Sequence, residues 1–228
     1  MDMSKGLQDD GYYIVRNVLT ANQIAELREG IEPLLKACPT AGIRSLAHKA
    51  PCVRRLSESP CVRELVEPVV GSGAQLIRSI LFNKNQEANW QVAWHQDVTI
   101  AVRDQAQING YTAWTLKDGI IHVQPPVAVL EQILTVRLHL DPADESNGAL
   151  WVSPGSHRLG RLPNEEAVSV AERQGKHLCA VQAGDALVFR PLLLHASRKA
   201  VSDSPRRVLH LEFSNAMLPA PLAWHEAA

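Results

Sequence analysis

No two cysteines in the sequence have the Cys-x-x-Cys spacing. The four that occur, Cys38, Cys52, Cys61 and Cys179, are scattered along 228 residues. Closely spaced pairs build structural zinc knuckles and dithiol redox sites, so we expect neither here. Isolated cysteines of this kind are expected to be buried thiols in a reducing compartment.

An excess of charge of one sign, a long apolar run and an apolar N-terminal segment are also absent. The net charge is −1, with Lys and Arg spread along the chain, which argues against nucleic acid or an anionic membrane as a partner. The longest apolar runs, such as residues 186–189 and 191–194, are far too short to cross a bilayer. The first residues lack the apolar core of a secretory signal. The sequence therefore predicts a cytoplasmic protein without a nucleic-acid or membrane partner.

What the sequence does contain is enough apolar material for one core. Because 46% of the residues are apolar, a single domain over residues 1–228 is expected. Its first part, about 1–73, has two patterns of apolar residues at helical spacing. One covers residues 21–36 behind Thr20 as N-cap, and the other covers 61–70. The apolar stripe of the first helix should pack against a sheet.

Short strands separated by turns dominate from about residue 74 to 214. Many strands without alternating helices favour a two-sheet antiparallel roll over a parallel α/β sheet. The expected fold is therefore mainly β, of α+β type, with the N-terminal helices packed on one sheet. After a first strand near residues 11–15, the predicted strands are 75–82, 133–140, 149–152, 177–181, 185–190 and 208–214.

The predicted strand at 133–140 alternates apolar and polar side chains. Its polar set is Thr135, Arg137 and His139. On an ordinary surface strand this set would face solvent, but in a barrel covered by helices it would point into the cavity. Residues 103–126 form a long, irregular insertion, which is typical of a lid or a binding loop.

His95 and Asp97 lie two residues apart in an extended stretch, so both side chains point the same way. They supply two of the three ligands of a 2-His-1-carboxylate site for non-haem Fe(II). His195, which ends an apolar run, is the candidate for the third. Arg206 starts the last predicted strand and could bind the distal carboxylate of a chelated keto acid. Since neighbours on a strand point to opposite faces, only one of Arg206 and Arg207 can do so.

The order of these motifs resembles the phytanoyl-CoA dioxygenase family over about residues 11–214. That family consists of Fe(II)- and 2-oxoglutarate-dependent oxygenases built on a double-stranded β-helix, a jelly-roll. The motifs that carry the resemblance are Trp94-His95-Gln96-Asp97, Thr135, Asn147-Gly148-Ala149-Leu150, Pro154-Gly155-Ser156-His157, Gly184-Asp185, His195-Ala196-Ser197 and Arg206.

The resemblance implies roles for individual residues. His95, Asp97 and His195 correspond to the iron ligands, and Arg206 to the 2-oxoglutarate clamp. Other positions at which such proteins hold the co-substrate are Thr135, Ser197 and Asn83. Halogenating relatives lack the carboxylate ligand, so the presence of Asp97 favours hydroxylation over halogenation.

The expected activity is oxidation, by hydroxylation, of an unactivated C–H bond in a small-molecule metabolite. Fe(II), 2-oxoglutarate and O2 would be required, and succinate and CO2 released. Residues expected to contact the substrate are Trp151, Arg137, Trp114, Lys117 and His122, with Arg103 as a lid contact. Two cations and two tryptophans favour a compact substrate with a carboxylate or phosphate and some apolar surface.

Two other readings stay open at this point. A jelly-roll protein could bind the metal and 2-oxoglutarate as a sensor without turnover, although it would not need the keto-acid clamp. A cupin-like isomerase or lyase would use another metal, but cupins typically have a His-x-His run, which the sequence lacks. Neither the substrate nor the oligomeric state can be derived from the sequence.

Overall fold

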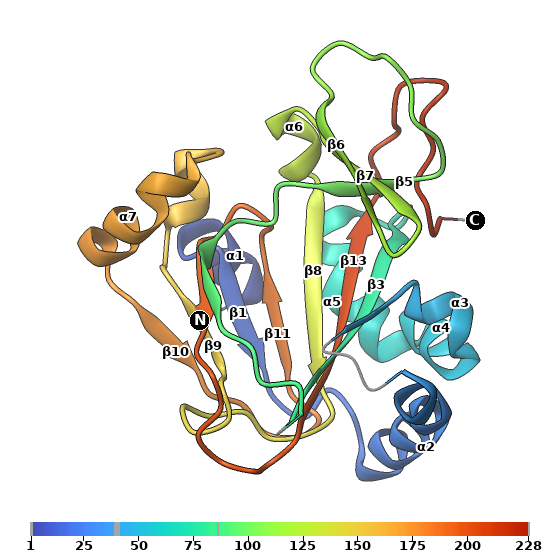
Figure 1. Cartoon of the computed structure of the whole chain (residues 1–228), viewed down its shortest axis with the longest axis vertical. Coiled ribbons are helices and arrows are strands. Elements are labelled where there is room, and N and C mark those ends of the chain that lie inside the picture. The colour runs from blue at the N-terminus through green and yellow to red at the C-terminus, as the bar shows by residue number, and fades with distance from the viewer. Residues whose placement is uncertain (1, 39–41, 86, 228) are drawn as a thin grey trace.

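The computed structural model describes residues 2–38, 42–85 and 87–227. Within them, thirteen strands form three antiparallel sheets (Figure 1). The major sheet has the order β1 (Tyr12–Val15), β11 (Ala186–Phe189), β8 (Ile133–His139), β13 (Arg206–Ser214), β3 (Gln75–Lys84), β2 (Gly42–Arg44). The minor sheet has the order β10 (His177–Cys179), β9 (Leu150–Val152), β12 (His195–Ser197), β4 (Val92–His95). This arrangement confirms the predicted antiparallel jelly-roll.

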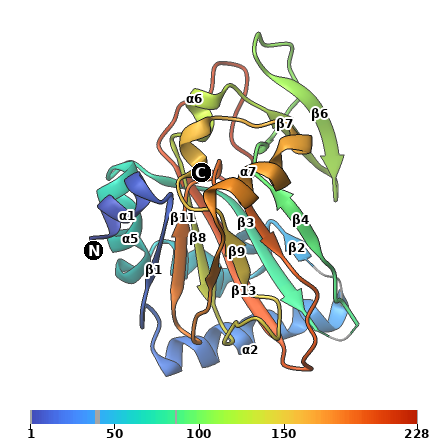
Figure 2. The ribbon, with the colours of Figure 1, turned by 90° about the vertical axis from the view of Figure 1, so that its left-hand side faces the viewer.

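Helices cover the outer face of the major sheet (Figure 2). The two predicted helices are present as α2 (Ala21–Ala37) and α5 (Pro60–Val70), and Thr20 and Gln23 form a capping box at the start of α2. Shorter helices that the sequence did not predict are α1 (Met3–Asp9), α3 (Leu46–Lys49), α4 (Pro51–Ser57) and α6 (Val127–Leu130). The apolar sides of the helices pack on Leu134, Val136 and Leu138 of β8 in the largest core cluster.

The inner face of the major sheet is polar where it faces the minor sheet. On β8, Thr135, Arg137 and His139 alternate with the apolar core residues and are all at most 5% exposed. The polar side of this strand therefore faces the interior. Of the two arrangements predicted for residues 133–140, the structure has the one in which the polar side chains point into the barrel. On the neighbouring strand β13, His210 and Glu212 pair with Arg137 and Thr135 and share that face.

The prediction that the segment 103–126 is irregular is wrong for residues 112–124, which form a hairpin of a third sheet. This sheet contains β5 (Ile100–Val102), β7 (Ile120–Gln124) and β6 (Thr112–Lys117), in that order. A tight turn with positive φ at Asp118 and Gly119 joins β6 to β7, and Asp118 forms an ion pair of 3.0 Å with Arg44 on β2. The hairpin therefore reaches back to the edge of the major sheet (Figure 1).

Other differences concern the ends of the chain and one helix. Strands β1 and β2, which come from the first 73 residues, form the two edges of the major sheet. No element was predicted near the C-terminus, where Trp224 pairs with Val102 and packs in the second core cluster. Between β9 and β10, a 3-10 turn, Asn164–Glu166, is followed by a further helix, α7 (Ala167–Gln174).

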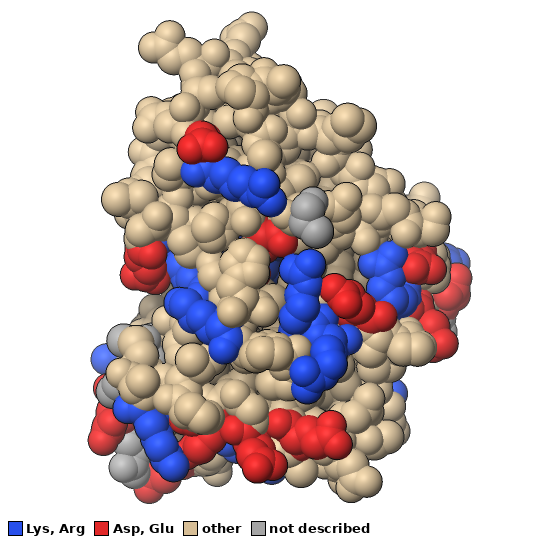
Figure 3. Space-filling view, turned by 90° about the vertical axis from the view of Figure 1, so that its right-hand side faces the viewer, with Lys and Arg blue, Asp and Glu red and all other residues tan. Residues whose placement is uncertain are grey.

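The surface has no dominant charge on the face shown in Figure 3. There, Lys and Arg lie interspersed with Asp and Glu, and neutral residues cover the upper part. Among the described residues, no helix is both long enough and apolar enough to cross a membrane. The prediction of buried cysteines is confirmed for Cys179 but wrong for Cys38, which is exposed, while Cys52 and Cys61 are partly buried.

Candidate active site

Two neighbouring strands of the minor sheet bring together the three predicted metal ligands. His95 is the last residue of β4, and His195 is the first residue of β12 and its direct partner across the ladder. Their rings lie 4.2 Å apart between centroids. Asp97 follows β4, with its carboxylate oxygens 3.6 Å from Nε2 of His195 and 3.9 Å from Nε2 of His95. One possible ligand atom from each of the three residues lies within 4.8 Å of the other two.

Hydrogen bonds fix the backbone and the rings of this triad. The Nδ1 atoms of His95 and His195 each lie 2.9 Å from a backbone carbonyl oxygen, of Ala93 and Leu193 respectively. A carbonyl only accepts, so Nδ1 carries the proton in each ring and the Nε2 lone pairs are left for a metal.

Gln96, between the two ligands, anchors the loop. Its side-chain amide donates to the carbonyls of Leu192 (2.6 Å) and Gly160 (2.8 Å), and its oxygen accepts from the N–H of Leu162 (2.8 Å). The N–H of Asp97 donates to the carbonyl of Pro191 (2.9 Å). The position of the carboxylate therefore depends on two chain segments that are distant in sequence.

The electrostatics of the triad fit a divalent cation. Burial alone would raise the pKa of Asp97, but His195 and His95 beside it hold that pKa below its ordinary value. Burial lowers the pKa of His195 to about 3, so the ring is neutral at pH 7. Oδ2 of Asp97 is buried and has no hydrogen-bond partner in the part of the chain that the structure describes. An ionised carboxylate with an unused oxygen and two imidazole lone pairs form the donor set that Fe(II) prefers in such sites.

Buried cations lie on the inner face of the major sheet near the triad. Arg206 is 2% exposed, and its Nε and Nη1 have no partner among the described residues. Lys84, its partner across β3 and β13, donates to the carbonyl of Arg198 (2.6 Å). Burial and the charge of Arg137 lower the pKa of Arg206 to about 9. Cations without a carboxylate are the complement that a dicarboxylic keto acid requires.

The other predicted co-substrate contacts differ in position. Thr135 lies on the inner face, and no other described residue forms a hydrogen bond with its buried Oγ1. Ser197 lies on the same side of β12 as His195. Asn83 pairs with Arg207 and so faces the other side of β3, while the next residue, Lys84, takes the inner position. The prediction for Asn83 therefore does not fit the register.

Among the predicted substrate contacts, Trp151 is on the wrong face. It is paired with Ala196, whereas Val152 is paired with His195, so the indole lies on the outer side of the minor sheet, 5.3 Å from the guanidinium carbon of Arg198. Arg103 is also misplaced, because it donates to the carbonyl of Ala227 (2.6 Å) and holds the C-terminal segment.

Three other predicted substrate contacts belong to the β6–β7 hairpin. His122 is 1% exposed, and burial lowers its pKa to about 4. Lys117 shares the hairpin face of His122 and Ile120 yet stays exposed, so it borders open space. Trp114 packs in the second core cluster. The remaining predicted contact, Arg137, lies inside the barrel.

The structure also reveals polar residues that the sequence analysis missed. His210 and Glu212 form a second group of possible metal ligands with Asp97. Nε2 of His210 lies 2.9 Å from Oε1 of Glu212, and Glu212 is in a buried ion pair with Arg78. The alternation of polar residues in β13 was the available signal. Because Arg78 already neutralises Glu212, we favour the first group for a metal.

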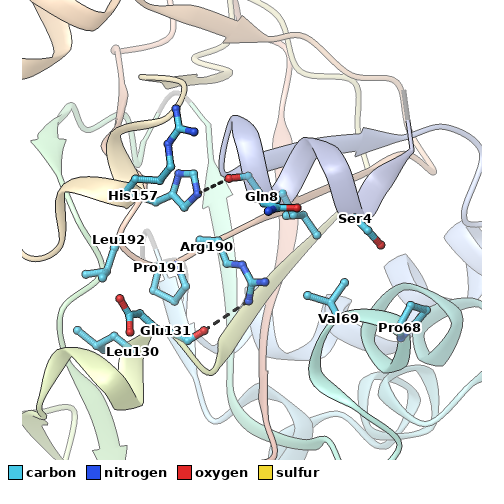
Figure 4. Close-up of a pocket in the computed structure, with 12 residues that line it drawn as sticks. Ser4, Gln8, Pro68, Val69, Leu130, Glu131, His157, Arg190, Pro191 and Leu192 are labelled. Atoms are coloured by element: carbon cyan, nitrogen blue, oxygen red, sulfur yellow. Dashed lines mark hydrogen bonds between the residues drawn. The ribbon is translucent and has the colours of Figure 1, made fainter.

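A cavity of about 460 Å³ lies elsewhere, beside α1 and α5 (Figure 4). Its lining includes Leu7, Gln8, Val69, His157 and Arg190. None of the residues predicted for the metal, the co-substrate or the substrate lines it. Its size alone therefore does not make it the active site.

Comparisons with known proteins agree with this geometry. The family model described as phytanoyl-CoA dioxygenase (PhyH) matches residues 7–208. An ectoine dioxygenase from Nocardia farcinica is 23% identical over 249 residues, covering 90% of this chain and 74% of the relative. The apo structure of EctD from S. alaskensis superposes with a TM-score of 0.71 at 20% identity, covering 92% of this chain and 75% of that one. The 2-oxoglutarate-dependent epimerase SnoN gives a TM-score of 0.71 at 19% identity, covering 97% and 83%.

Proposed function

The chain belongs to the phytanoyl-CoA dioxygenase family, and on that premise we propose that it is an Fe(II)- and 2-oxoglutarate-dependent dioxygenase that hydroxylates a C–H bond of a small-molecule metabolite. The observation that carries the proposal is the convergence of His95, Asp97 and His195 within 4.8 Å. We also propose that this oxygenase domain extends over the whole chain.

The residues present would hold both groups. His95, Asp97 and His195 would bind Fe(II), and the unpartnered guanidinium of Arg206 would bind the distal carboxylate of 2-oxoglutarate. When bound, the iron and 2-oxoglutarate supply the oxidising power from O2, with succinate and CO2 as co-products. Thr135 and Ser197, on the inner faces, would add hydroxyl contacts to the co-substrate.

The protein's own residues would position the substrate and enclose it. The partly exposed side chains of His95 (35%) and Asp97 (20%) mark the side of the triad that is open to a substrate. We place the substrate between this side and the β6–β7 hairpin, where Lys117 borders open space. Closure of that space by a bound substrate would keep water from the metal.

The experiment is to supply the protein with Fe(II), 2-oxoglutarate and O2, and to screen candidate metabolites for stimulated succinate release. We expect at least one metabolite to raise succinate formation and to gain one oxygen atom by mass spectrometry. Asp97→Ala should abolish the stimulation, whereas Arg198→Gln, on the outer face of the minor sheet, should retain it. Full turnover by Asp97→Ala would refute the site.

Two other outcomes would redirect the assignment. Product with unchanged mass would favour an isomerisation, the type of reaction named for the similar structure SnoN. Tight binding of Fe(II) and 2-oxoglutarate without O2 consumption by any metabolite would favour a sensor.

A further inference from the structure

Arg137 is a buried cation without a partner at the centre of the major sheet. It is 5% exposed, and no hydrogen bond or ion pair joins its side chain to another residue in the described part of the chain. Its guanidinium carbon lies 5.3 Å from the ring centroid of Phe82 on β3. Since β13 separates β8 from β3, the side chain must lie across β13, over the inner face of the sheet.

This position is between the metal triad and Arg206. On the triad side, Arg137 is paired across β8 and β13 with His210, which has a ring nitrogen within 4.8 Å of a carboxylate oxygen of Asp97. On the other side, Arg206 lies four residues before His210 on β13 and therefore on the same face of the sheet. A 2-oxo diacid that chelates a metal at the triad and reaches Arg206 with its far carboxylate must pass through the same space.

Among the described residues, no ion pair neutralises the three cations around this space, Arg137, Arg206 and Lys84. Burial, Arg206 and Arg137 lower the pKa of Lys84 to about 8, so its ammonium group is largely charged at pH 7. Of the two acids of this interior, Asp97 belongs to the metal triad and Glu212 is already paired with Arg78. A buried guanidinium without an anion is costly, and its fork of N–H donors matches a carboxylate. The ligand of this space must therefore bring more than one negative group.

We propose that Arg137 binds the carboxylate next to the keto group of the 2-oxo acid, so that a guanidinium holds each end of the co-substrate. The inference rests on the proposed function, and it moves Arg137 from the substrate, where the sequence placed it, to the co-substrate. Lys117, on the hairpin, remains the cation on the substrate side.

The test uses two ligands that differ at one end. The full-length protein is loaded with Fe(II) without oxygen and titrated with 2-oxoglutarate, or with 2-oxobutanoate, which lacks the distal carboxylate. Binding is read from the visible charge-transfer absorption of the metal–keto-acid chelate. We expect Arg206→Gln to weaken 2-oxoglutarate binding about 10-fold or more and to leave 2-oxobutanoate binding within about twofold. Arg137→Gln should weaken binding of both ligands by the same factor, about 10-fold.

Controls separate a local effect from a damaged fold. Arg137→Lys should recover part of the lost affinity, because it restores the charge but not the fork. Arg198→Gln, on the outer face of the minor sheet, should match the wild type. Circular dichroism should show each variant folded.

Two results would overturn the inference and leave the proposed function intact. One is unchanged 2-oxobutanoate binding in Arg137→Gln with weakened 2-oxoglutarate binding, which would place Arg137 at the distal carboxylate. The other is no effect on either ligand, which would place it outside the co-substrate site. A wild-type protein that binds neither keto acid would overturn the proposed function itself.

Discussion

Arg207 and Asp141 form a two-pronged ion pair on the outer face of the major sheet. Nε of Arg207 lies 2.8 Å from Oδ2, Nη2 lies 2.8 Å from Oδ1, and the backbone N–H of Arg207 also donates to Oδ2 at 2.8 Å. The adjacent Arg206 faces the interior and has no partner among the described residues. Alternation along β13 thus separates a structural arginine from one available to a ligand, which supports Arg206 as the proposed clamp.

Substitution of these two neighbours should have opposite effects. Arg206→Gln should weaken 2-oxoglutarate binding by about 1.5–3 kcal/mol, the usual worth of hydrogen bonds to a charged group. It should leave the free energy of unfolding equal or higher, since it removes an unpaired buried charge. Arg207→Gln should lower the free energy of unfolding by about 2 kcal/mol and leave 2-oxoglutarate binding unchanged. Urea unfolding and ligand titration measure the two effects. The reverse pattern would make Arg207 the 2-oxoglutarate clamp and Arg206 the structural arginine.

Gln96→Ala should weaken metal binding without removing any ligand. The side chain makes three hydrogen bonds to backbone groups that hold the loop between His95 and Asp97. Loss of such supporting contacts typically costs about 10–100-fold in metal affinity. Competition titration with a chelator measures the affinity, and a variant with wild-type affinity would show that the loop is held in another way. Asn89→Ala is the control, because Asn89 bonds to backbone groups of Ala200 away from the triad.

Stability should fall in acid partly because of His122. Burial lowers its pKa to about 4, while the unfolded chain has the ordinary value of 6.5. Above pH 6.5 the ring is neutral in both states. Between pH 6.5 and 4 only the unfolded state takes up the proton, so the free energy of unfolding decreases as the pH falls. From pH 7 to 5 this one group should cost about 2 kcal/mol.

The check compares wild type with His122→Gln, with the free energy of unfolding measured in urea at several pH values. The other buried histidines contribute equally to both proteins, so the variant should show the smaller loss between pH 7 and 5. Equal losses would mean that His122 is already accessible to protons in the folded state.

Gly148→Ala should destabilise the turn before β9. Gly148 has φ +78°, and an added Cβ would lie 2.7 Å from the carbonyl oxygen of Arg198 and 2.8 Å from Nζ of Lys84. Backbone strain and displacement of Lys84 should lower the free energy of unfolding by about 1–3 kcal/mol. In Gly73→Ala, where nothing lies within 4 Å of the added atom, the change should be much smaller. Thermal unfolding of both variants gives the comparison, and equal effects would contradict the steric argument.

The sequence predicted most of what alternation and local capping determine. The helix after Thr20 has the predicted start, and the polar residues of 133–140 face the interior because their apolar neighbours pack under the helices. The spacing of His95 and Asp97 likewise fixed their common direction, and the pairing of β4 with β12 brings His195 to them.

The predictions that were wrong concern residues whose direction is set by the register between neighbouring strands. Whether Trp151 faces inward is set by its pairing with Ala196 rather than His195, and the sequence of β9 alone does not contain that register. Asn83 and Lys84 are neighbours on β3. The pairing with β13 places Lys84, and not Asn83, on the inner face of the sheet. The β6–β7 hairpin was missed because a register shift between Thr112 and Thr115 breaks the alternation.

The most direct test of the account is the position of the metal in crystals of the protein grown with Mn(II) as a substitute for Fe(II). Asp97 belongs to two possible ligand groups, one with His95 and His195 and one with His210 and Glu212. We expect one anomalous-scattering peak, bound by His95, Asp97 and His195. A peak bound by His210 and Glu212, or no ordered metal at either group, would contradict it.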